Sequence, residues 1–586
     1  MVALIKTAQK ELNPGLARPD GSLAFGNWAV INEEDRFEVY PHPIGSVTAA
    51  EEAIKKCDSV FEEVLPEMTT VLNDYHQEEN DEAFYRILLG PSLLKYLHQF
   101  YEKYLIIKGV LESRKASPNT IQYLHTSQWV IPVDVPDFVE KFGCNDLGAE
   151  QQFAQIMRFL GVEGEEAKVQ RPLAQKTEFR IRRGNLFVNI GERFIRAVQQ
   201  RCYGRSVILS HHYSGWTAYK LSLLSGFRFA VDDFRDMGMS MQIHPDWVGR
   251  RTRISANGRS EFAQLVLSKF LLNIPAIYLE AYKELMRNVR GIKRRSPDIL
   301  VSATGLLGHN PMLSALVADA GKRTYKVLMQ HGGNYGTDRI NASEEVERRI
   351  GNVFLYWGNA RNEIPVSALP LQRYRESQKT KNVIRGKAIT LFLVEFPKFV
   401  QRLHTGIRPS SWASVDLQRI VEFLKSTDKV REDIRLKPYS HNYGKDVIAE
   451  IKDKIEWVRI EKRTSSHRKL ILGSRICVFP FITTGYLQAL SANIPTVIFL
   501  DRNFVELRPD ALPEFKLLSD AGILHRSGRS AAEHIERVIE DLAGWWDSEK
   551  TVIARHKFLE AHGRASKTWV KEWIEIRESI LGQDRR

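Results

Sequence analysis

One stretch, residues 325–336, constrains the fold of this chain more than any other. Residues 325–329 form a short apolar run of the kind found in buried strands. The run stops at Gln330 and His331, and two glycines follow at once. A strand end holds a histidine in place, and glycines let backbone N–H groups approach a ligand closely. The sequence therefore predicts a ligand site at this strand end, with His331 in it.

The residues before this stretch indicate the type of sheet. Residues 298–302 have the pattern of a strand, residues 303–310 that of a loop, and residues 311–320 that of a helix. Strand, helix and strand within about 30 residues make a βαβ unit, which predicts a parallel sheet. Ligands bind at the carboxyl ends of such strands, where His331 would lie. A histidine at a turn can also be purely structural, so both roles stay open for His331.

Composition narrows the class of protein. The chain has 586 residues, 43% of them hydrophobic, which is enough for three or four domain-sized units with their own cores. Its four cysteines form no CxxC pair, which argues against a disulfide framework or a zinc ribbon and fits a reducing compartment. The N-terminus lacks a signal-peptide core, and no run of 18 apolar residues is present. We therefore expect a cytoplasmic protein.

The charge of the chain predicts an anionic partner. The net charge is +13 and the pI is about 9.3, with basic clusters at residues 180–183, 250–253 and 287–295. Attraction to nucleic acid, to a phosphorylated substrate or to an acidic membrane surface would each explain this balance. No nucleic-acid-binding motif accompanies the clusters. We therefore expect an anionic substrate and peripheral contact with an anionic membrane, and no nucleic acid.

Hydrophobic periodicity and turn residues divide the chain into five segments. We expect a mainly helical N-terminal elaboration (1–145), a first Rossmann-like lobe (146–358), a linker (359–387), a second Rossmann-like lobe (388–544) and C-terminal helices (545–586). Within the first segment, Gly90 and Pro91 are expected to end a helix. Residues 128–133 have the pattern of a strand.

Three further strand ends carry polar side chains. Residues 206–210 lead into His211 and His212, which we predict to contact an acceptor. Metal binding is disfavoured there, because adjacent side chains in an extended loop diverge and no third ligand stands at a suitable spacing. Strands at 227–231 and 388–394 end in Asp232 and Glu395, which are rivals of His331 as a catalytic base.

Two loops in the second lobe are predicted to bind phosphate. The exit of the strand at 433–437 carries Arg435, Lys437 and His441 around a turn, and a basic surface turn is the alternative reading. The second loop is a strand-to-helix junction whose residues could hold a phosphate with hydroxyls, N–H groups and the helix dipole, although a helix N-cap uses the same residues. Its members are Thr483, Thr484 and Gly485, with Gln488 one turn into the helix.

Two such lobes joined by a linker are the layout of GT-B glycosyltransferases. Beyond this layout, several motifs resemble a family of transferases encoded in bacterial O-antigen and surface-polysaccharide gene clusters, and they cover nearly the whole chain. These motifs lie at residues 25–28, 86–91, 330–336, 435–438, 442–444, 484–496 and 545–546. The chain is more distantly similar to capsule transferases that use CMP-activated 3-deoxy-ulosonic acids. It departs from relatives at Gln488, where they usually carry Glu, and in the spacing at 439–441.

The resemblance implies an α/β, GT-B-like fold and a glycosyltransferase that moves a sugar from a nucleotide-sugar donor to a glycan or lipid-linked acceptor. It implies no cofactor and no metal, and the sequence has no convincing Asp-x-Asp motif. His331 would be the base or a cation that stabilises the leaving phosphate, and inversion or retention stays open. The expected donor-binding residues are Gln330, Gly332, Gly333, Arg435, Lys437, His441, Thr483, Thr484, Gly485 and Gln488.

Two other functions fit the same pattern. The presence of Gln488 in place of the relatives' glutamate would suit a degenerate, non-catalytic scaffold that binds glycans or nucleotides in an assembly complex. A two-lobed sugar-nucleotide epimerase shares the layout, although the large helical N-terminal part argues against it.

Overall fold

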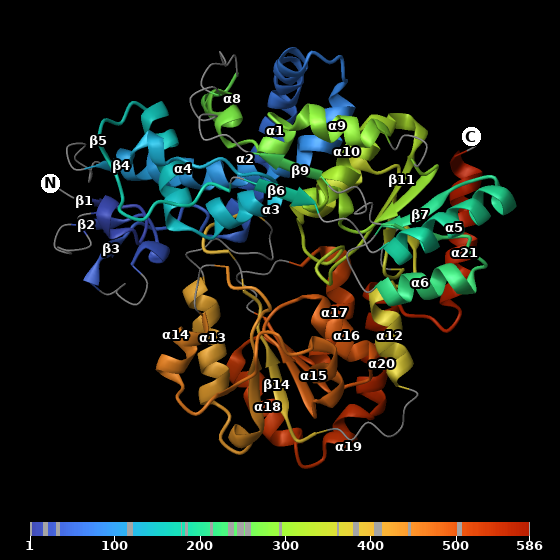
Figure 1. Cartoon of the computed structure of the whole chain (residues 1–586). Helices are drawn as coiled ribbons and strands as arrows, with labels where there is room; N and C mark the ends of the chain where they lie inside the picture. The colour runs from blue at the N-terminus through green and yellow to red at the C-terminus, as the bar shows by residue number, and fades with distance from the viewer. Residues whose placement is uncertain are drawn as a thin grey trace.

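The computed structural model describes most of the chain. The residues outside the description are 1–2, 14, 16–21, 31–35, 114–120, 177, 182–185, 211–214, 233–238, 243–250, 252–258, 292–295, 360–362, 379–385, 396, 404–412, 444–446, 501–506 and 585–586. Two parallel sheets organise the described part, one in an upper and one in a lower lobe (Figure 1).

The first sheet has six parallel strands in the order β13-β12-β11-β10-β7-β8. The predicted βαβ unit is confirmed, because strands β10 and β11 pair in parallel and helix α10 (Pro311–Ala320) connects them in the chain. The strands are β7 (Val207–Ser210), β8 (Ala230–Val231), β10 (Ile299–Ser302), β11 (Tyr325–Met329), β12 (Val353–Tyr356) and β13 (Ile364–Pro365).

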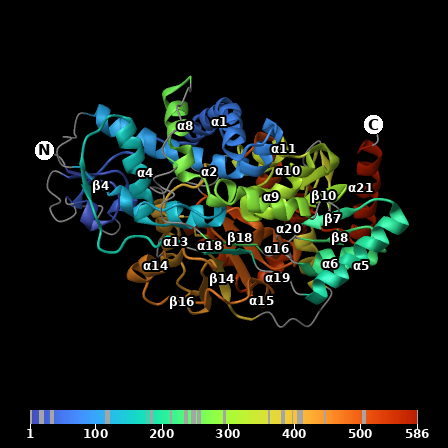
Figure 2. The ribbon, with the colours of Figure 1, turned by 45° about the horizontal axis from the view of Figure 1, so that its top comes forward.

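Alternating side chains of the first sheet feed two separate cores. Ile208, Leu300 and Leu328 belong to the core shared with the N-terminal helices, whereas Val207 and Val301 belong to the core on the other face. A strand covered on both faces reads as a continuous apolar run, which is why these strands were recognisable in the sequence. Helices α2 (Glu82–Glu112), α9 (Tyr282–Gly291) and α10 lie together on the first of these faces (Figure 2).

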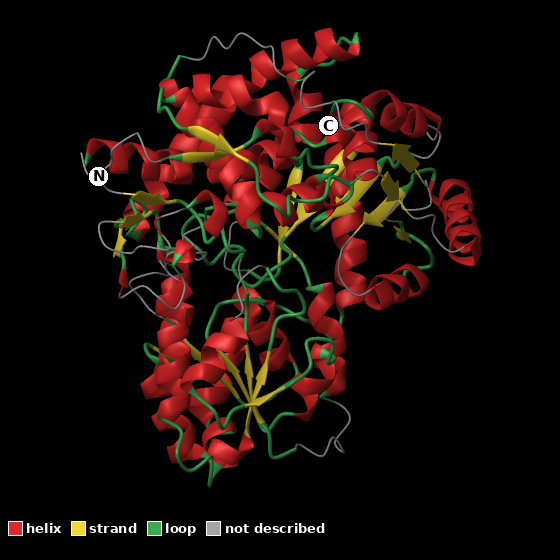
Figure 3. Ribbon diagram, turned by 60° about the vertical axis from the view of Figure 1, so that its left-hand side comes forward, coloured by secondary structure: helices red, strands yellow, loops and turns green. Residues whose placement is uncertain are grey.

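The second sheet also has six parallel strands, in the order β16-β15-β14-β17-β18-β19. Helices flank it on both sides (Figure 3). The strands are β14 (Ile389–Phe392), β15 (Ile434–Lys437), β16 (Arg459–Ile460), β17 (Ile476–Phe479), β18 (Thr496–Phe499) and β19 (Leu524–His525). The fold is therefore α/β and GT-B-like, with two Rossmann-like lobes, as predicted.

Strand order locates the crevice in each sheet. In the second sheet the chain starts at β14, moves outward through β15 and β16, and returns to β17 on the other side of β14. This reversal opens a crevice at the carboxyl ends of β14 and β17, which is where doubly wound sheets bind ligands. In the first sheet the same reversal falls between β7 and β10.

The N-terminal segment contains two long helices, α1 (Val47–His76) and α2, and a small parallel sheet of β1 (Ala3–Ile5), β2 (Ser22–Ala24) and β3 (Glu38–Val39). The predicted helix end at Gly90 and Pro91 is wrong, because α2 continues through both residues. Helix α2 is buried along most of its length, and Lys95 Nζ donates to the carbonyls of Pro91 and Leu307. Tertiary packing thus outweighs the local cost of a proline inside a helix.

The strand predicted at residues 128–133 is also wrong. Side-chain amides replace a neighbouring strand there: Gln151 bonds the N–H and C=O of Val130, and Gln175 bonds those of Ile131. Val130, Ile131 and Val133 are buried, and their burial produced the strand-like pattern.

The predicted linker does more than connect the lobes. Its strand β13 extends the first sheet, and its helix α12 (Leu369–Ser377) packs against helix α16 (Thr484–Ser491) of the second lobe and against helix α6 (Gly215–Leu224) of the first.

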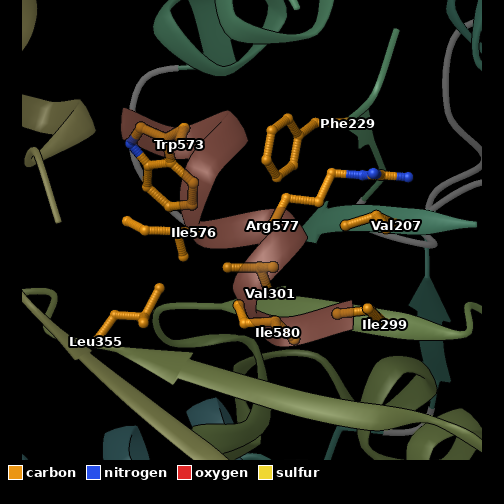
Figure 4. Close-up of a pocket in the computed structure, with 9 residues that line it drawn as sticks. All are labelled: Val207, Phe229, Ile299, Val301, Leu355, Trp573, Ile576, Arg577 and Ile580. Carbon is orange, nitrogen blue, oxygen red and sulfur yellow. The ribbon is translucent and has the colours of Figure 1, made fainter. Parts of the chain in front are cut away.

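The C-terminal helices tie the lobes together. Helix α20 (Glu549–His562) packs in the second lobe, whereas α21 (Trp569–Asp584) returns to the first. Trp573 of α21 meets Phe229 edge-on, with ring centroids 5.8 Å apart, and Ile576 and Ile580 face strands β7 and β10 (Figure 4). No helix in the described ranges is long and apolar enough to cross a membrane.

Candidate functional site

Two loops from opposite lobes touch each other. A Cβ on Gly333 would lie 2.4 Å from the carbonyl oxygen of Thr483 and 3.1 Å from a ring carbon of Tyr486. Only glycine permits so close an approach. The hydroxyl of Tyr486 also donates to the carbonyl of Gly333 over 3.4 Å. The loop after β11 and the start of α16 therefore form one site between the lobes.

His331 lies in this site at the end of β11. Its side chain is 14% exposed, so it is shielded but not sealed from solvent. Its ring packs at a tilt on Tyr335, with centroids 4.3 Å apart, and Nδ1 lies 3.8 Å from Oε2 of Glu347. A strand end and two buried neighbours thus fix the orientation of the imidazole.

A buried carboxyl network supports the loop from below. Helix α11 (Ala342–Ile350) supplies Glu344 and Glu347, and both are almost fully buried. Tyr335 donates its hydroxyl to Glu347 over 2.6 Å, and the N–H of Gly336 donates to Glu344 over 2.9 Å. Burial raises the pKa of Glu347 well above its usual range, and the hydrogen bond from the Tyr335 hydroxyl opposes this rise. The network holds the loop rigid beneath His331.

Gln330 holds the glycine turn in place through both atoms of its side-chain amide. Its Nε2 donates to the carbonyl of Gly332 over 2.9 Å, and its Oε1 accepts from the N–H of Trp357 over 2.9 Å. These two hydrogen bonds therefore hold the glycine turn against the end of β12. The N–H groups of Gly332 and Gly333 donate to no residue in the described part of the chain.

The predicted strand-to-helix junction lies at the start of helix α16. Thr483 is the N-cap, and its Oγ1 accepts from the N–H of Gly485 over 3.3 Å. A Cβ on Gly485 would lie 2.7 Å from the ring of Phe479, so glycine allows the helix to start close to the sheet. The Oγ1 of Thr484 would lie 3.7 Å from a Cβ on Gly332. The positive end of α16 therefore faces the glycine turn of the first lobe.

Glu395 lies at the carboxyl end of β14, in the crevice that the strand order predicts. It is buried, and Arg463 donates to its Oε1 over 2.6 Å. Arg463 also donates to the carbonyls of Tyr439 and His441, over 3.0 and 3.3 Å. The guanidinium thus links the carboxylate to the turn that follows β15.

Lys437 ends strand β15 and points into the same region. Its Nζ donates to the carbonyls of Pro438 and Arg463, over 2.7 and 2.9 Å. Burial lowers its pKa, and the nearby charge of Arg463 acts in the same direction. His441 follows on the exposed side of this turn. Lys437 therefore fixes the basic turn and contributes positive charge at the carboxyl edge of the sheet.

Arg435 is placed differently from the other predicted phosphate ligands. It lies two residues before the end of β15, and its half-exposed side chain pairs with Glu461 at 3.3 Å. The structure does not bring it to the start of α16.

Gln488, the departure from the resembled family, has a local partner. Its side chain lies beside His467, whose Nε2 would lie 3.4 Å from a Cβ on Gly485. Burial lowers the pKa of His467 to about 4, and the charge of Lys437 contributes. His467 is therefore neutral at pH 7 and can accept or donate one hydrogen bond at each ring nitrogen.

Of the other predicted residues, Asp232 does not join this site. Asp232 ends β8, three strands from β11, which is about 14 Å at the usual strand spacing. It is buried and pairs with Arg196. His211 and His212 lie outside the described residues. Within the described ranges, no group of three or more His, Cys, Asp or Glu side chains is arranged to hold a metal ion.

Several residues of the site were not predicted, among them Glu347, Tyr486, Arg463 and His467. Glu347 sits in a charged stretch of the sequence, and Arg463 and His467 sit in a polar connection without periodicity. Tyr486 directly follows the predicted Thr-Thr-Gly start, and its position was the one available signal.

Comparison with known proteins gives a family for the chain. The model described as LIC12162 family transferase matches residues 4–576. No curated protein matches.

Several solved structures are similar at low identity. The trehalose-phosphate synthase (UDP-forming) of Burkholderia vietnamiensis is 9% identical over 65% of this chain and 97% of its own, with a TM-score of 0.35. The UDP-GlcNAc 2-epimerase of Methanocaldococcus jannaschii is 12% identical over 64% and 99%, with a TM-score of 0.34. The O-GlcNAc transferase of Thermobaculum terrenum is 11% identical over 91% and 98%, with a TM-score of 0.33.

Proposed function

The chain belongs to the LIC12162 family of transferases, and from this premise we propose that it is a glycosyltransferase. In this proposal a sugar moves from a nucleotide-sugar donor to a glycan or lipid-linked acceptor in surface-polysaccharide synthesis. The observation that carries the proposal is the contact of the Gly333 turn with the start of α16. It joins a histidine of one lobe to an anion-type site of the other.

The donor phosphates would bind at the start of α16. Helix dipole, the threonine hydroxyls and the N–H groups of the first turn all favour an anion there. The crevice between β14 and β17 would hold the nucleotide, as in other doubly wound sheets. Lys437 and Arg463 add positive charge beside it. These groups would stabilise the leaving nucleotide without a metal ion.

His331 would handle the acceptor proton. A histidine imidazole changes charge near neutral pH, so it can accept the proton of the acceptor hydroxyl as that oxygen attacks the anomeric carbon. The bond from this carbon to the phosphate oxygen then breaks, and the nucleotide leaves with the electron pair. Tyr335 and Glu347 would hold the imidazole in place. Glu395 is a weaker candidate for the base, because Arg463 already pairs with it.

Contact with an anionic membrane belongs to the same proposal. The net charge of +13 supports it, and a lipid-linked acceptor at the cytoplasmic face of a membrane would explain the need. Two basic residues of the predicted clusters are engaged within the fold: Arg251 pairs with Glu280, and Arg290 pairs with Glu78. Flotation with anionic and neutral vesicles at low and high salt tests the membrane contact. Binding that does not depend on lipid charge or on salt would contradict this electrostatic account.

Incubation with a panel of sugar nucleotides tests the proposed activity. A transferase releases nucleotide, and an acceptor accelerates the release. A binding scaffold shows affinity without release, and an epimerase returns a new sugar nucleotide with no acceptor needed. Thr484→Ala should weaken nucleotide binding by about 1–3 kcal/mol for a lost hydrogen bond to a charged group. Arg435→Ala is the matched control, since its guanidinium pairs with Glu461. Unchanged affinity in Thr484→Ala would remove α16 from the donor site.

A further inference from the structure

A second polar pocket opens between the lobes, beside the site described above. Its volume is about 280 Å³, close to the lower limit of small-molecule sites. Three elements build it: α6 of the first lobe, α12 of the connecting segment, and α15 (His467–Gly473) of the second lobe. The lining residues are Trp216, Thr217, Lys220, Arg373, Glu376, Ser377 and Arg468.

The pocket is adjacent to the candidate donor site. Arg468 directly follows His467, which lies beside Gln488 of α16 and near the start of that helix. Helix α12 packs along α16 itself. On the other side, α6 follows β7, whose carboxyl end borders the crevice of the first sheet. A ligand in the pocket would therefore lie within reach of both lobes.

The charge of the lining favours an anion. Three cations face one carboxylate in the lining, and that carboxylate, Glu376, already pairs with Lys220 at 2.7 Å. Arg373 forms no ion pair within the described chain. Arg468 donates through Nη2 to Ser377 over 2.9 Å, while its Nε is buried with no hydrogen-bond partner among the described residues. Two guanidinium groups thus have donors left for a carboxylate or a phosphate.

One wall of the pocket is an aromatic ring. Trp216 is 72% exposed, the largest exposure among the large hydrophobic side chains of the described chain. An exposed indole offers a ligand a large apolar face. An exposed indole face suits the apolar C–H face of a sugar ring, and the adjacent cations suit an acidic group on the same sugar.

We propose that this pocket binds an acidic sugar residue, carrying a carboxylate or a phosphate, of the acceptor. The sugar ring stacks on Trp216, and Arg373 and Arg468 bind the acidic group. The assignment of this sugar to the acceptor rests on the proposed glycosyltransferase function. The binding of an acidic sugar rests only on the pocket itself.

Ligand-observed NMR on the full-length protein tests the pocket. The probes are methyl glucuronoside and glucose 6-phosphate, which carry the two acidic groups, and methyl glucoside, which carries none. Both acidic sugars should bind, and methyl glucoside should bind at least about tenfold more weakly, as the loss of a charge-assisted hydrogen bond implies. Equal binding of the neutral glucoside would overturn the assignment.

Variants separate this pocket from others. Trp216→Ala, Arg373→Gln and Arg468→Gln should each weaken the acidic sugars about tenfold. Arg529→Gln is the matched control, because Arg529 lines another polar pocket, of about 370 Å³, that has basic side chains but no aromatic wall. Inorganic phosphate added as competitor should displace the sugars only at concentrations well above theirs. If phosphate competes equally and Trp216→Ala binds as the parent does, the pocket is a simple anion site and the proposal fails.

Nucleotide binding distinguishes the two proposals. The three pocket variants should bind nucleotide like the parent and, in the transfer assay, raise the KM for an acidic acceptor with little change in nucleotide release without acceptor. Acidic-sugar binding in a protein that binds no nucleotide would sink the proposed function and leave the pocket assignment standing. Loss of nucleotide binding in all three variants would place the pocket within the donor site and overturn its assignment to the acceptor.

Discussion

Replacing Gly333 with alanine probes the contact between the lobes. The added Cβ would lie 2.4 Å from the carbonyl oxygen of Thr483 and 2.8 Å from its carbonyl carbon, and both are backbone atoms. Ordinary contact begins at 3.4 Å, so one loop has to move by about 3.4 − 2.4 = 1.0 Å. Overpacking of this kind costs about 1–3 kcal/mol of stability. A displacement of about 1 Å in a catalytic arrangement can reduce the rate about 10²-fold.

The adjacent glycine is the matched control. A Cβ on Gly332 would meet the side-chain oxygen of Asn334 at 2.9 Å, which rotation of that amide relieves, and Thr484 Oγ1 at 3.7 Å, an ordinary contact. Gly332→Ala should therefore melt at the parental temperature or slightly above it, because alanine restricts the unfolded chain. Its rate of nucleotide release should also stay near that of the parent.

The two variants are compared by thermal melting and by acceptor-dependent nucleotide release. Gly333→Ala should lose both stability and turnover, and turnover should fall by more than the folded fraction explains. Parental turnover in Gly333→Ala, or greater damage in Gly332→Ala, would refute the account of how the lobes meet.

The other predictions concern single groups in the site and the core. His331→Ala should melt normally but reduce transfer by about 10²–10⁴-fold, the usual contribution of a general base; near-parental turnover in folded protein would remove His331 from the mechanism. Thr483→Ala removes the N-cap of α16 and should lower the free energy of unfolding by about 0.5–2 kcal/mol, measured by urea denaturation, with no loss expected for Thr484→Ala. Burial lowers the pKa of Lys103 from 10.5 to about 8, so the folded state resists its charge. Lys103→Met should therefore raise the free energy of unfolding by about 3 kcal/mol at pH 7, at 1.36 kcal/mol per pKa unit, and this gain should vanish as pH rises from about 8 to 10.5. A gain that is independent of pH would show that packing and not charge is responsible.

The local pattern of the sequence determined the elements that end at the site. The strand Tyr325–Met329 and the helix Pro311–Ala320 have the predicted bounds, because a run of buried apolar residues and a proline at a helix start act over a few residues. Parallel pairing followed from the βαβ spacing, so the carboxyl-edge position of His331 and Thr483 could be predicted as well. The same local rules failed where distant residues intervene: Pro91 continues a helix that its neighbours bury, and Gln151 replaces a strand partner of Val130.

Only the tertiary structure decided which of these residues meet. Gly333 and Thr483 are 150 positions apart in the chain, and their contact depends on how two lobes pack, which no local pattern encodes. The same holds for Arg435, which pairs with Glu461 across neighbouring strands and so turns away from the phosphate-type site. Trp216 belongs to a pocket whose walls come from three distant segments. Sequence determined the elements because their hydrogen bonds and burial are local, whereas the site depends on contacts that form only when those elements are packed together.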